Sequence, residues 1–266
     1  MQHLSADIFL ITWPGDYAWL PHLFKSITKY VTGFSRVVIV LEIGDAPPTE
    51  ALEKYATFPY VIKRCPGYRG TCYNGRSGQS LEKLRAFAYT DADRIVMTDS
   101  DCIFVRPIDL QTDELINLAK PCIWSIPWDE LPPYHYTLPS GEQGVDYATK
   151  WRPPVSKILG FDPPAETMQR FPFVFPGWFL RCLWEHIGGE ERLLTIPETC
   201  DFNTMGNFAL AKFPDFFTQR PALNSPLPAA MKNFWSFTGA DHSSVREILK
   251  EHGLLEDDNA KAPDVL

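Results

Sequence analysis

The carboxylates of Asp99 and Asp101 stand one residue apart within an otherwise apolar run over residues 94–105. Such a run, bounded by polar residues, is typical of a β-strand that is covered on both faces. Two buried carboxylates need a compensating cation or access to solvent, because an unpaired buried charge is costly. If the backbone stays extended, both side chains project to the same side. A divalent cation such as Mg²⁺ or Mn²⁺ would fit there, since it prefers oxygen ligands and shares its shell with substrate phosphates.

The elements predicted before this run indicate that it belongs to an α/β sheet. Strands and helices are expected in the order β-α-β-α-β, over residues 7–12, 17–31, 36–42, 49–55 and 60–63. This order is typical of a parallel, doubly wound sheet, in which ligands bind beyond the carboxyl ends of the strands. Asp16 stands at the N-cap position of the first helix. A helix over residues 79–90 then leads into the run that carries the two acids.

The second half of the chain is less regular. We expect helices over residues 109–119, 146–151, 177–187, 201–213 and 243–251, and strands over residues 122–126 and 233–239. Three proline pairs indicate that residues 127–176 are mainly loop. The sequence contains no internal repeat and no domain linker, so we expect a single domain.

Composition and charge limit the class of protein. The 266 residues carry a formal net charge of −8, which argues against a protein that coats nucleic acid non-specifically. Six cysteines show no metal-ligand spacing and are expected to be free thiols, with a Cys65–Cys72 disulfide as the alternative. We find no signal peptide and no apolar stretch of roughly 20 residues, so we expect a soluble, cytoplasmic protein without a membrane span.

A cationic loop follows the third predicted strand. Residues 63–78 contain glycines, tyrosines and no acid, together with four cationic side chains: Lys63, Arg64, Arg69 and Arg76. Glycine lets a backbone approach a ligand closely, and Arg and Lys suit phosphate oxygens. The loop is either a solvated surface segment or a contact for a phosphorylated ligand or polymer.

Four segments, in order along the chain, resemble the GT-A-fold glycosyltransferases, and more closely their bacterial and phage members. IVMTDSDCIFVRP at residues 95–107 resembles the core ILDSDTVFLRP of that group, and GQSLEKL at residues 78–84 resembles its Gly…Gln…Lys-Leu helix. PETCDFNTMGNF at residues 197–208 is similar to its SEYELYGNF segment, and FWSFTG at residues 234–239 to its C-terminal aromatic strand. The resemblance implies a GT-A-like, Rossmann-type α/β fold: a mostly parallel sheet flanked by helices, with a loop-rich C-terminal acceptor half.

The resemblance also implies a metal and a donor. The donor would be a nucleotide sugar, with a UDP-sugar first among the candidates, and the metal would be Mn²⁺ or Mg²⁺. Asp101 would be the direct metal ligand, and Asp99 would contact the metal or the ribose of the donor. His242 would be a late metal ligand, although its position also suits a surface histidine that caps the next helix.

Further residues take their expected places from the same resemblance. The nucleotide base would be bordered by four residues that follow the first two strands: Thr12, Trp13, Asp16 and Glu42. Gln79 and Lys83 would lie at the donor, with Lys83 reaching the diphosphate or the sugar. Glu198 and Asp201 would lie beside the transferred sugar, one of them as general base or as the group that orients the acceptor. Both acids also stand where carboxylates favour a helix N-terminus electrostatically, which is the alternative explanation.

The implied function is transfer of a sugar from a nucleotide-diphosphate sugar to an acceptor hydroxyl. One glycosyltransferase domain would contain a nucleotide-sugar-binding half at residues 1–126, an acceptor half at residues 127–255 and a tail at residues 256–266. The expected acceptor is a glycan or another saccharide. The alternative is DNA that carries hydroxymethylated pyrimidines, contacted through Lys63, Arg64, Arg69 and Arg76. Retention or inversion at the anomeric carbon stays open.

Two other classes of function compete with this one. Phosphatases that begin with a D-x-D need a later acidic pair after another strand, and the late pair Asp257-Asp258 lies in the polar tail instead. A non-catalytic module that binds nucleotides or carbohydrates would tolerate replacement of both D-x-D acids by alanine.

Overall fold

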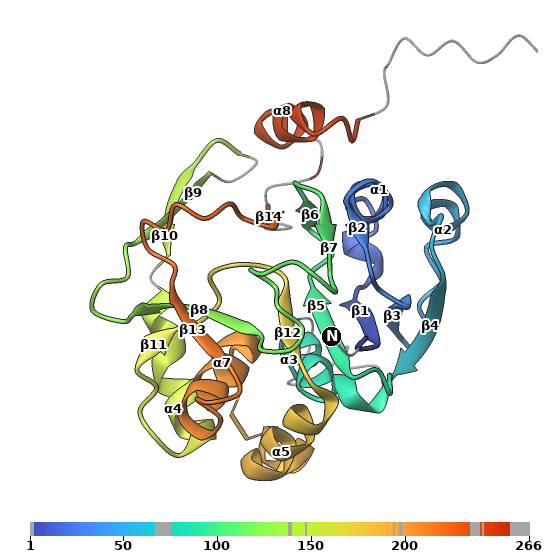
Figure 1. Ribbon diagram of the computed structural model, residues 1–266. Coiled ribbons are helices and arrows are strands. Elements are labelled where there is room, and N and C mark those ends of the chain that lie inside the picture. Colours follow the sequence, from blue (N-terminus) through green and yellow to red (C-terminus); the bar gives the residue numbers. More distant parts are fainter. Residues whose placement is uncertain are drawn as a thin grey trace, which may run out of the picture.

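Five strands form the central sheet: β1 (Ala6–Ile11), β3 (Arg36–Glu42), β4 (Tyr60–Cys65), β5 (Arg94–Thr98) and β12 (Phe173–Phe175). Their order is β12-β5-β1-β3-β4 (Figure 1). β1 pairs in parallel with β3 and β5, and β3 pairs in parallel with β4, whereas β12 runs antiparallel to β5. The computed structural model describes residues 3–66, 76–137, 140–146, 148–193, 195–196, 199–234, 240 and 242–255. The expected mostly parallel, Rossmann-type sheet is confirmed.

Three helices accompany the parallel strands: α1 (Leu20–Tyr30), α2 (Thr49–Tyr55) and α3 (Arg76–Leu84). The predicted N-cap at Asp16 is wrong, because Trp19 occupies the N-cap of α1. Asp16 instead ends a 3₁₀ helix, Pro14–Asp16, which begins shortly after β1 ends at Ile11. The helix expected over residues 79–90 also ends earlier, and a 3₁₀ helix, Ala86–Ala88, follows it.

The apolar run with the two acids is a strand, a turn and a second strand. β5 ends before Asp99, and a turn that includes Asp101 leads into β6 (Cys102–Phe104). The N–H of Cys102 donates to the carbonyl of Asp99 over 3.3 Å, which closes this turn. The expectation of one continuous strand is therefore wrong, and the two acids project from a turn. β6 pairs antiparallel with β14 (Met231–Asn233), which brings the C-terminal part of the chain to the turn.

A second sheet of three strands lies in the C-terminal half: β11 (Ala165–Glu166), β8 (Cys122–Pro127) and β13 (Thr218–Pro221), in that order. β8 runs antiparallel to β11 and parallel to β13. Two short strand pairs complete the description: β9 (Tyr134–Thr137) with β10 (Gln143–Asp146), and β2 (Val31–Thr32) with β7 (Ile108–Asp109).

Residues 109–119 form the end of β7 and turns, so the helix expected there is wrong. The carboxylate of Asp113 accepts the N–H groups of Leu115 and Ile116, each over 3.0 Å. Such local bonds offer the backbone an alternative to helical hydrogen bonds. Asn117 then adopts a φ of +46°, a left-handed conformation in which a right-handed helix cannot continue.

A helix, α4 (Arg152–Leu159), forms where paired prolines indicated a loop. Pro153 and Pro154 lie in its first turn, where helical N–H groups have no intrahelical acceptor, so neither proline removes a hydrogen bond. The helix expected at residues 146–151 is reduced to a 3₁₀ helix, Ala148–Trp151. The remaining helices are α5 (Gly177–Ile187), α6 (Gly189–Leu193), α7 (Asp201–Lys212) and α8 (Ser243–Glu251), and α5 and α8 have the expected bounds.

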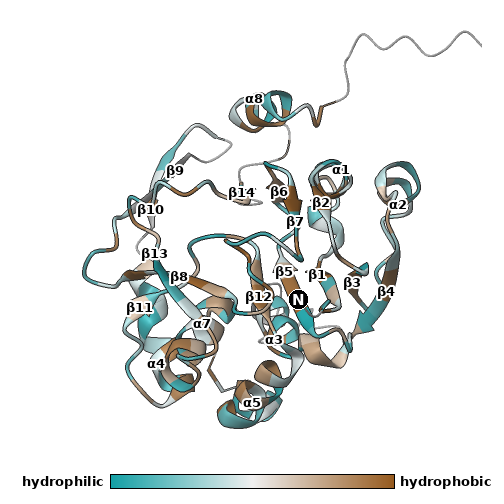
Figure 2. Ribbon diagram, in the orientation of Figure 1, coloured by the Kyte–Doolittle hydropathy of each residue, from teal (hydrophilic) through white to brown (hydrophobic). Residues whose placement is uncertain are grey.

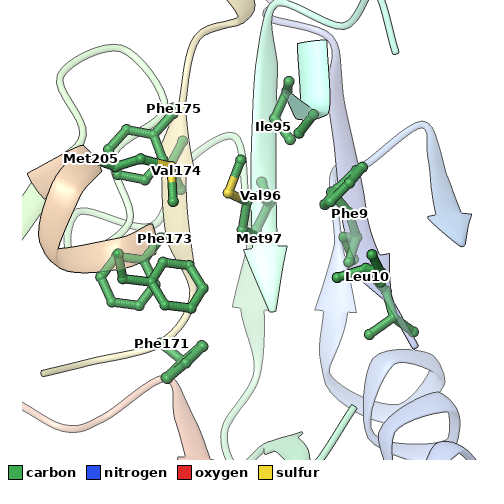
Figure 3. Packing of buried hydrophobic residues seen from close by; sticks show 14 of the residues in the cluster. Phe9, Leu10, Ile95, Val96, Met97, Phe171, Phe173, Val174, Phe175 and Met205 are labelled. Atoms are coloured by element: carbon green, nitrogen blue, oxygen red, sulfur yellow. The ribbon is translucent and has the colours of Figure 1, made fainter. Parts of the chain in front are cut away.

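The main apolar core fills the space around β5 and β12. Figure 3 shows Val96 and Met97 of β5 facing the phenylalanines of β12, with Met205 of α7 beyond them and Phe9 of β1 on the other side. Figure 2 shows the hydrophobic colour on β6 and β12. The core therefore joins β1, β5, β12 and α7, the elements whose ends carry the candidate site.

Five cysteines are free thiols, as expected: Cys65, Cys102, Cys122, Cys182 and Cys200. Cys72 lies outside the described residues. Among the helices that the structure describes, none combines the length and apolarity that crossing a membrane requires.

Candidate functional site

The ammonium group of Lys83, on α3, stands between two carboxylates. Its Nζ lies 2.5 Å from Asp99 Oδ1 and 3.1 Å from Asp201 Oδ2. Burial alone would lower the pKa of Lys83, but the charges of Asp201 and Asp99 outweigh burial and raise it. Burial raises the pKa of Asp99, and the charge of Lys83 opposes that effect. Lys83 is therefore a charged side chain that joins the D-x-D turn to the N-terminus of α7.

A buried network fixes α3 beneath this lysine. The carboxylate of Glu82 is fully buried and accepts hydrogen bonds from Arg85 Nε, over 2.8 Å, and from the hydroxyl of Tyr89. Ser80 Oγ donates to the carbonyl of Thr199 over 3.4 Å. These contacts tie α3 to the 3₁₀ helix after it and to the segment that enters α7.

Two buried asparagines hold α7 against β11. Asn203 Oδ1 accepts the N–H of Thr167 over 2.6 Å, and Asn207 Nδ2 donates to the carbonyl of Ala165 over 2.8 Å. Both asparagines are fully buried. A Cβ at Gly206 would lie 2.3 Å from Thr167 Oγ1, so glycine permits this close approach. The position of Asp201 at the start of α7 is thus set by contacts with the second sheet.

The aromatic ring of Phe202 packs against the ammonium group of Lys83. Lys83 Nζ lies 4.4 Å from the centre of the Phe202 ring, within the range of a cation–π contact. The same ring stacks on Phe173 of β12 with 4.1 Å between centroids. The N–H of Phe202 also donates to Asp201 Oδ1 over 2.8 Å. Both oxygens of the Asp201 carboxylate therefore accept from groups within the protein.

Two more segments meet the D-x-D turn. Ser100 Oγ donates to Asp16 Oδ2 over 3.0 Å, which brings the segment after β1 to the turn. The N–H of Phe234 donates to the carbonyl of Asp101 over 3.0 Å, directly after β14. Four segments that lie far apart in the sequence thus converge here.

A cavity of about 780 Å³ lies among these side chains. Ile11, the last residue of β1, lines it, so the cavity opens at the carboxyl ends of the parallel strands. Seven residues predicted for the site line it: Trp13, Asp16, Gln79, Lys83, Asp99, Asp101 and Asp201. The structure thus brings together most of the side chains that the sequence indicated.

Thr12 and Glu42, predicted to border the base, are not among the lining residues. Thr12 is buried, and its hydroxyl has no hydrogen-bond partner among the described residues. Glu42 ends β3 and is partly exposed. Trp13, by contrast, is 45% exposed, and its indole packs so closely on Gly15 that a Cβ there would lie 2.4 Å from the ring.

His242 and Glu198 are not placed in the cavity by the described structure. His242 is the N-cap of α8, and its Nδ1 accepts the N–H of Ser244 over 3.4 Å. This is the helix-capping position that the sequence left as the alternative. Glu198 lies outside the described residues.

The oxygen donors at this edge of the cavity suit a cation that is only partly held by protein. Within the described residues, no three His, Cys, Asp or Glu side chains gather around a possible metal position. The lining does offer the carboxylates of Asp99 and Asp101 and the amide of Asn233. Mg²⁺ is commonly held by one or two carboxylates together with water and substrate phosphates. The donor set therefore fits Mg²⁺ or Mn²⁺ that binds together with a phosphorylated ligand.

The cationic loop is described only at its ends. Lys63 is exposed on β4. The guanidinium of Arg64 donates to the carbonyls of Glu42 and Asp45, over 3.0 and 2.7 Å, so it supports the segment after β3. Arg69 and the side chain of Arg76 lie outside the described residues.

Glu166 also lines the cavity, and the sequence did not single it out. It is 1% exposed and accepts hydrogen bonds from the N–H of Met168, over 2.8 Å, and from the amide of Gln169. Burial raises its pKa, although these two hydrogen bonds oppose the shift. No local signal separates Glu166 from a solvated loop acid, because its burial depends on pairing between β11 and β8.

Comparison with known proteins identifies the fold. No protein-family model matches the sequence, and no curated protein matches it. The structure is similar to that of the galactosyltransferase LgtC in complex with donor and acceptor sugar analogues, with 12% identity, a TM-score of 0.51, and coverage of 94% of this chain and 98% of that one. It also matches 4-diphosphocytidyl-2C-methyl-D-erythritol synthase from Anaerococcus prevotii, with 12% identity, a TM-score of 0.49, and coverage of 93% and 96%. The expected GT-A-like α/β fold is confirmed.

Proposed function

We propose that this protein is a metal-dependent glycosyltransferase that moves a sugar from a nucleoside-diphosphate sugar to an acceptor hydroxyl. The observation that carries the proposal is the convergence of Asp99, Asp101, Lys83 and Asp201 on one cavity at the carboxyl ends of parallel strands. Open α/β sheets bind their ligands at such ends. The fold shared with a galactosyltransferase is consistent with this reading.

The charge of the cavity supports a requirement for a metal. Among its described lining residues, five are acids and one, Lys83, is a cation. A diphosphate would be repelled by this excess of negative charge at short range. Mn²⁺ or Mg²⁺, held by Asp99 and Asp101, would compensate it and stabilise the charge that develops on the departing diphosphate.

The residues of the chain then have distinct tasks. Lys83 offsets part of the negative charge of Asp99 and Asp201 and fixes their orientation, so that Asp99 faces the cavity in a set position. Asp201 accepts from Lys83 and from the N–H of Phe202, so its task is to position Lys83 and the sugar and not to take up a proton. Trp13, exposed at the cavity, is proposed to cover the base of a uridine nucleotide.

Glu166 is proposed to contact the sugars. A buried carboxyl that already accepts two hydrogen bonds can receive a further one from a sugar hydroxyl, since a carboxylate has about four acceptor positions. We propose a saccharide as the acceptor.

A panel of nucleotide sugars tests the proposal. Hydrolysis and transfer would be measured for UDP-, GDP-, CDP- and ADP-sugars, each with Mn²⁺, with Mg²⁺ and with a chelator. We expect turnover of one nucleotide class that requires metal and falls at least about 100-fold in Asp101→Asn, the size of effect seen when one strong electrostatic group is lost. The exposed acid Asp215 provides the control Asp215→Asn. Turnover that is equal in the chelator, or equal in Asp101→Asn, would contradict the proposal.

A further inference from the structure

Two arginine side chains contact the ring of one buried tryptophan beside the cavity. The guanidinium carbon of Arg170 lies 4.3 Å from the centre of the Trp124 ring, and that of Arg220 lies 6.0 Å from it. Trp124 is 7% exposed, and both arginines are half-buried. Two cations thus approach the ring of one side chain.

The second sheet places this cluster on the face that lines the cavity. Ile126 of β8 and Glu166 of β11 are paired, and both line the cavity. Trp124 lies two residues before Ile126, so its side chain points to the same face, about 7 Å further along the strand. Arg220 of β13 is paired with Trp124 and shares that face. Arg170 follows Gln169, which also lines the cavity.

No described carboxylate compensates this charge. Within the described residues, the hydrogen bonds and ring contacts of the two arginine side chains are all to carbonyl oxygens or to the ring of Trp124. Buried Arg220 Nε has no hydrogen-bond partner among them. A guanidinium that is partly desolvated and unpaired is costly, and so is a buried donor without an acceptor. An anion would remove both costs.

The two arginines differ in how firmly they are held. Arg170 donates to the carbonyls of Leu227 and Ser225, over 2.8 and 3.3 Å, so part of its role is to support that loop. Arg220 has no such bond to the described residues, and its contact is the approach of its guanidinium carbon to 6.0 Å from the centre of the Trp124 ring. Arg220 therefore has N–H donors available for a ligand, among them the buried Nε.

We propose that Arg220, assisted by Arg170, binds the phosphate group of a phosphorylated saccharide acceptor whose hydroxyl enters the cavity. This rests on the proposed function, because it specifies the acceptor of that same site. A guanidinium fork matches the oxygens of a phosphate. A small sugar phosphate is favoured over nucleic acid, because the net charge of −8 repels a polyanion.

Calorimetric binding of hexose monophosphates, of the matched neutral hexoses and of a short single-stranded oligonucleotide tests this without any turnover. We expect the wild-type protein to bind a hexose phosphate, and Arg220→Gln to weaken that binding about 10- to 100-fold, as for the loss of charged hydrogen bonds. Arg220→Lys, which keeps the charge, should lie between the two. Arg181→Gln removes an arginine stacked on Phe87 elsewhere in the fold and is the matched control, expected to bind as the wild type.

Three outcomes would overturn the inference: equal binding of phosphorylated and neutral hexoses, equal effects of Arg220→Gln and Arg181→Gln, or binding of the oligonucleotide alone. Thermal unfolding of each variant shows whether it is folded. If Arg220→Gln does not fold, the hexose phosphate affinity of Arg220→Lys replaces it as the test. Donor hydrolysis by the wild-type protein is scored separately. Phosphate binding through Arg220 without any nucleotide-sugar turnover would support the anion site and contradict the proposed function.

Discussion

Lys83 Nζ on α3 lies 3.1 Å from Asp201 Oδ2 on α7 and also binds Asp99 of the D-x-D turn. Three elements that belong to different parts of the chain are therefore joined by one buried ammonium group. The same contact affects the charge of the cavity, because the single charge of Lys83 offsets only part of the charge of the two carboxylates. Stability and site geometry depend here on the same atoms.

Replacing Lys83 by methionine should destabilise the protein. It leaves two carboxylates near each other without their cation, and breaking a buried ion pair costs about 3–5 kcal/mol. The partial exposure of Asp99, 27% of its side chain, places the expected loss near 3 kcal/mol. Denaturant unfolding measures it.

A double-mutant cycle isolates the contact with Asp201. Asp201→Asn in the Lys83→Met background should cost less than it does alone, with a coupling of about 1–3 kcal/mol. Asp215→Asn in the same background serves as the uncoupled comparison and should be additive. If both cycles are additive, Lys83 and Asp201 do not stabilise each other.

Gly206 should not tolerate alanine, although alanine favours helices. The added Cβ would lie 2.3 Å from Thr167 Oγ1 and 2.5 Å from Thr167 Cβ, so α7 would have to move away from β11. Overpacking of this kind costs about 1–3 kcal/mol. Gly177→Ala at the start of α5 is the control, because its nearest contact is 3.9 Å away. A Gly206→Ala variant as stable as the wild type would refute the close packing of α7 on β11.

The pH dependence of stability should report on Glu166. Its pKa is raised by burial above the ordinary value of 4.5. As pH rises, the Glu166 carboxyl loses its proton at a lower pH in the unfolded state than in the folded state. The folded state therefore loses stability between the ordinary pKa and the raised pKa of this group. Glu166→Gln removes this loss, and should be more stable than the wild type at neutral pH, with the difference vanishing below about pH 4. A difference that grows as pH falls would have the wrong sign.

Much of the first half of the fold follows from local patterns. Buried apolar runs and helical spacing predict β1, α2 and β3 closely, because these elements pack on one continuous core. Those patterns also predict the start of β5 and place Asp99 and Asp101 in the apolar run that continues it. They miss the turn between the two acids, since the bond from Cys102 to Asp99 leaves no trace in hydrophobicity.

The structure of the C-terminal half of the chain is harder to predict from local patterns, because contacts between residues far apart in the sequence determine it. Glu166 is buried only through pairing of β11 with β8, and Asn207 is buried in α7 because Ala165 accepts its hydrogen bond. Neither residue type is expected inside a core. Pro153 and Pro154 read as a loop although they begin a helix. The arginines around Trp124 meet through strand pairing that the sequence does not reveal.

Calorimetric titration of UDP into the protein, with Mn²⁺ and with a chelator, tests the central claim most directly. The account predicts binding that weakens at least about 10-fold without the metal, and an Asp101→Asn variant in which the metal no longer matters. Equal affinity with and without Mn²⁺ in the wild-type protein, or full metal dependence in Asp101→Asn, would contradict it.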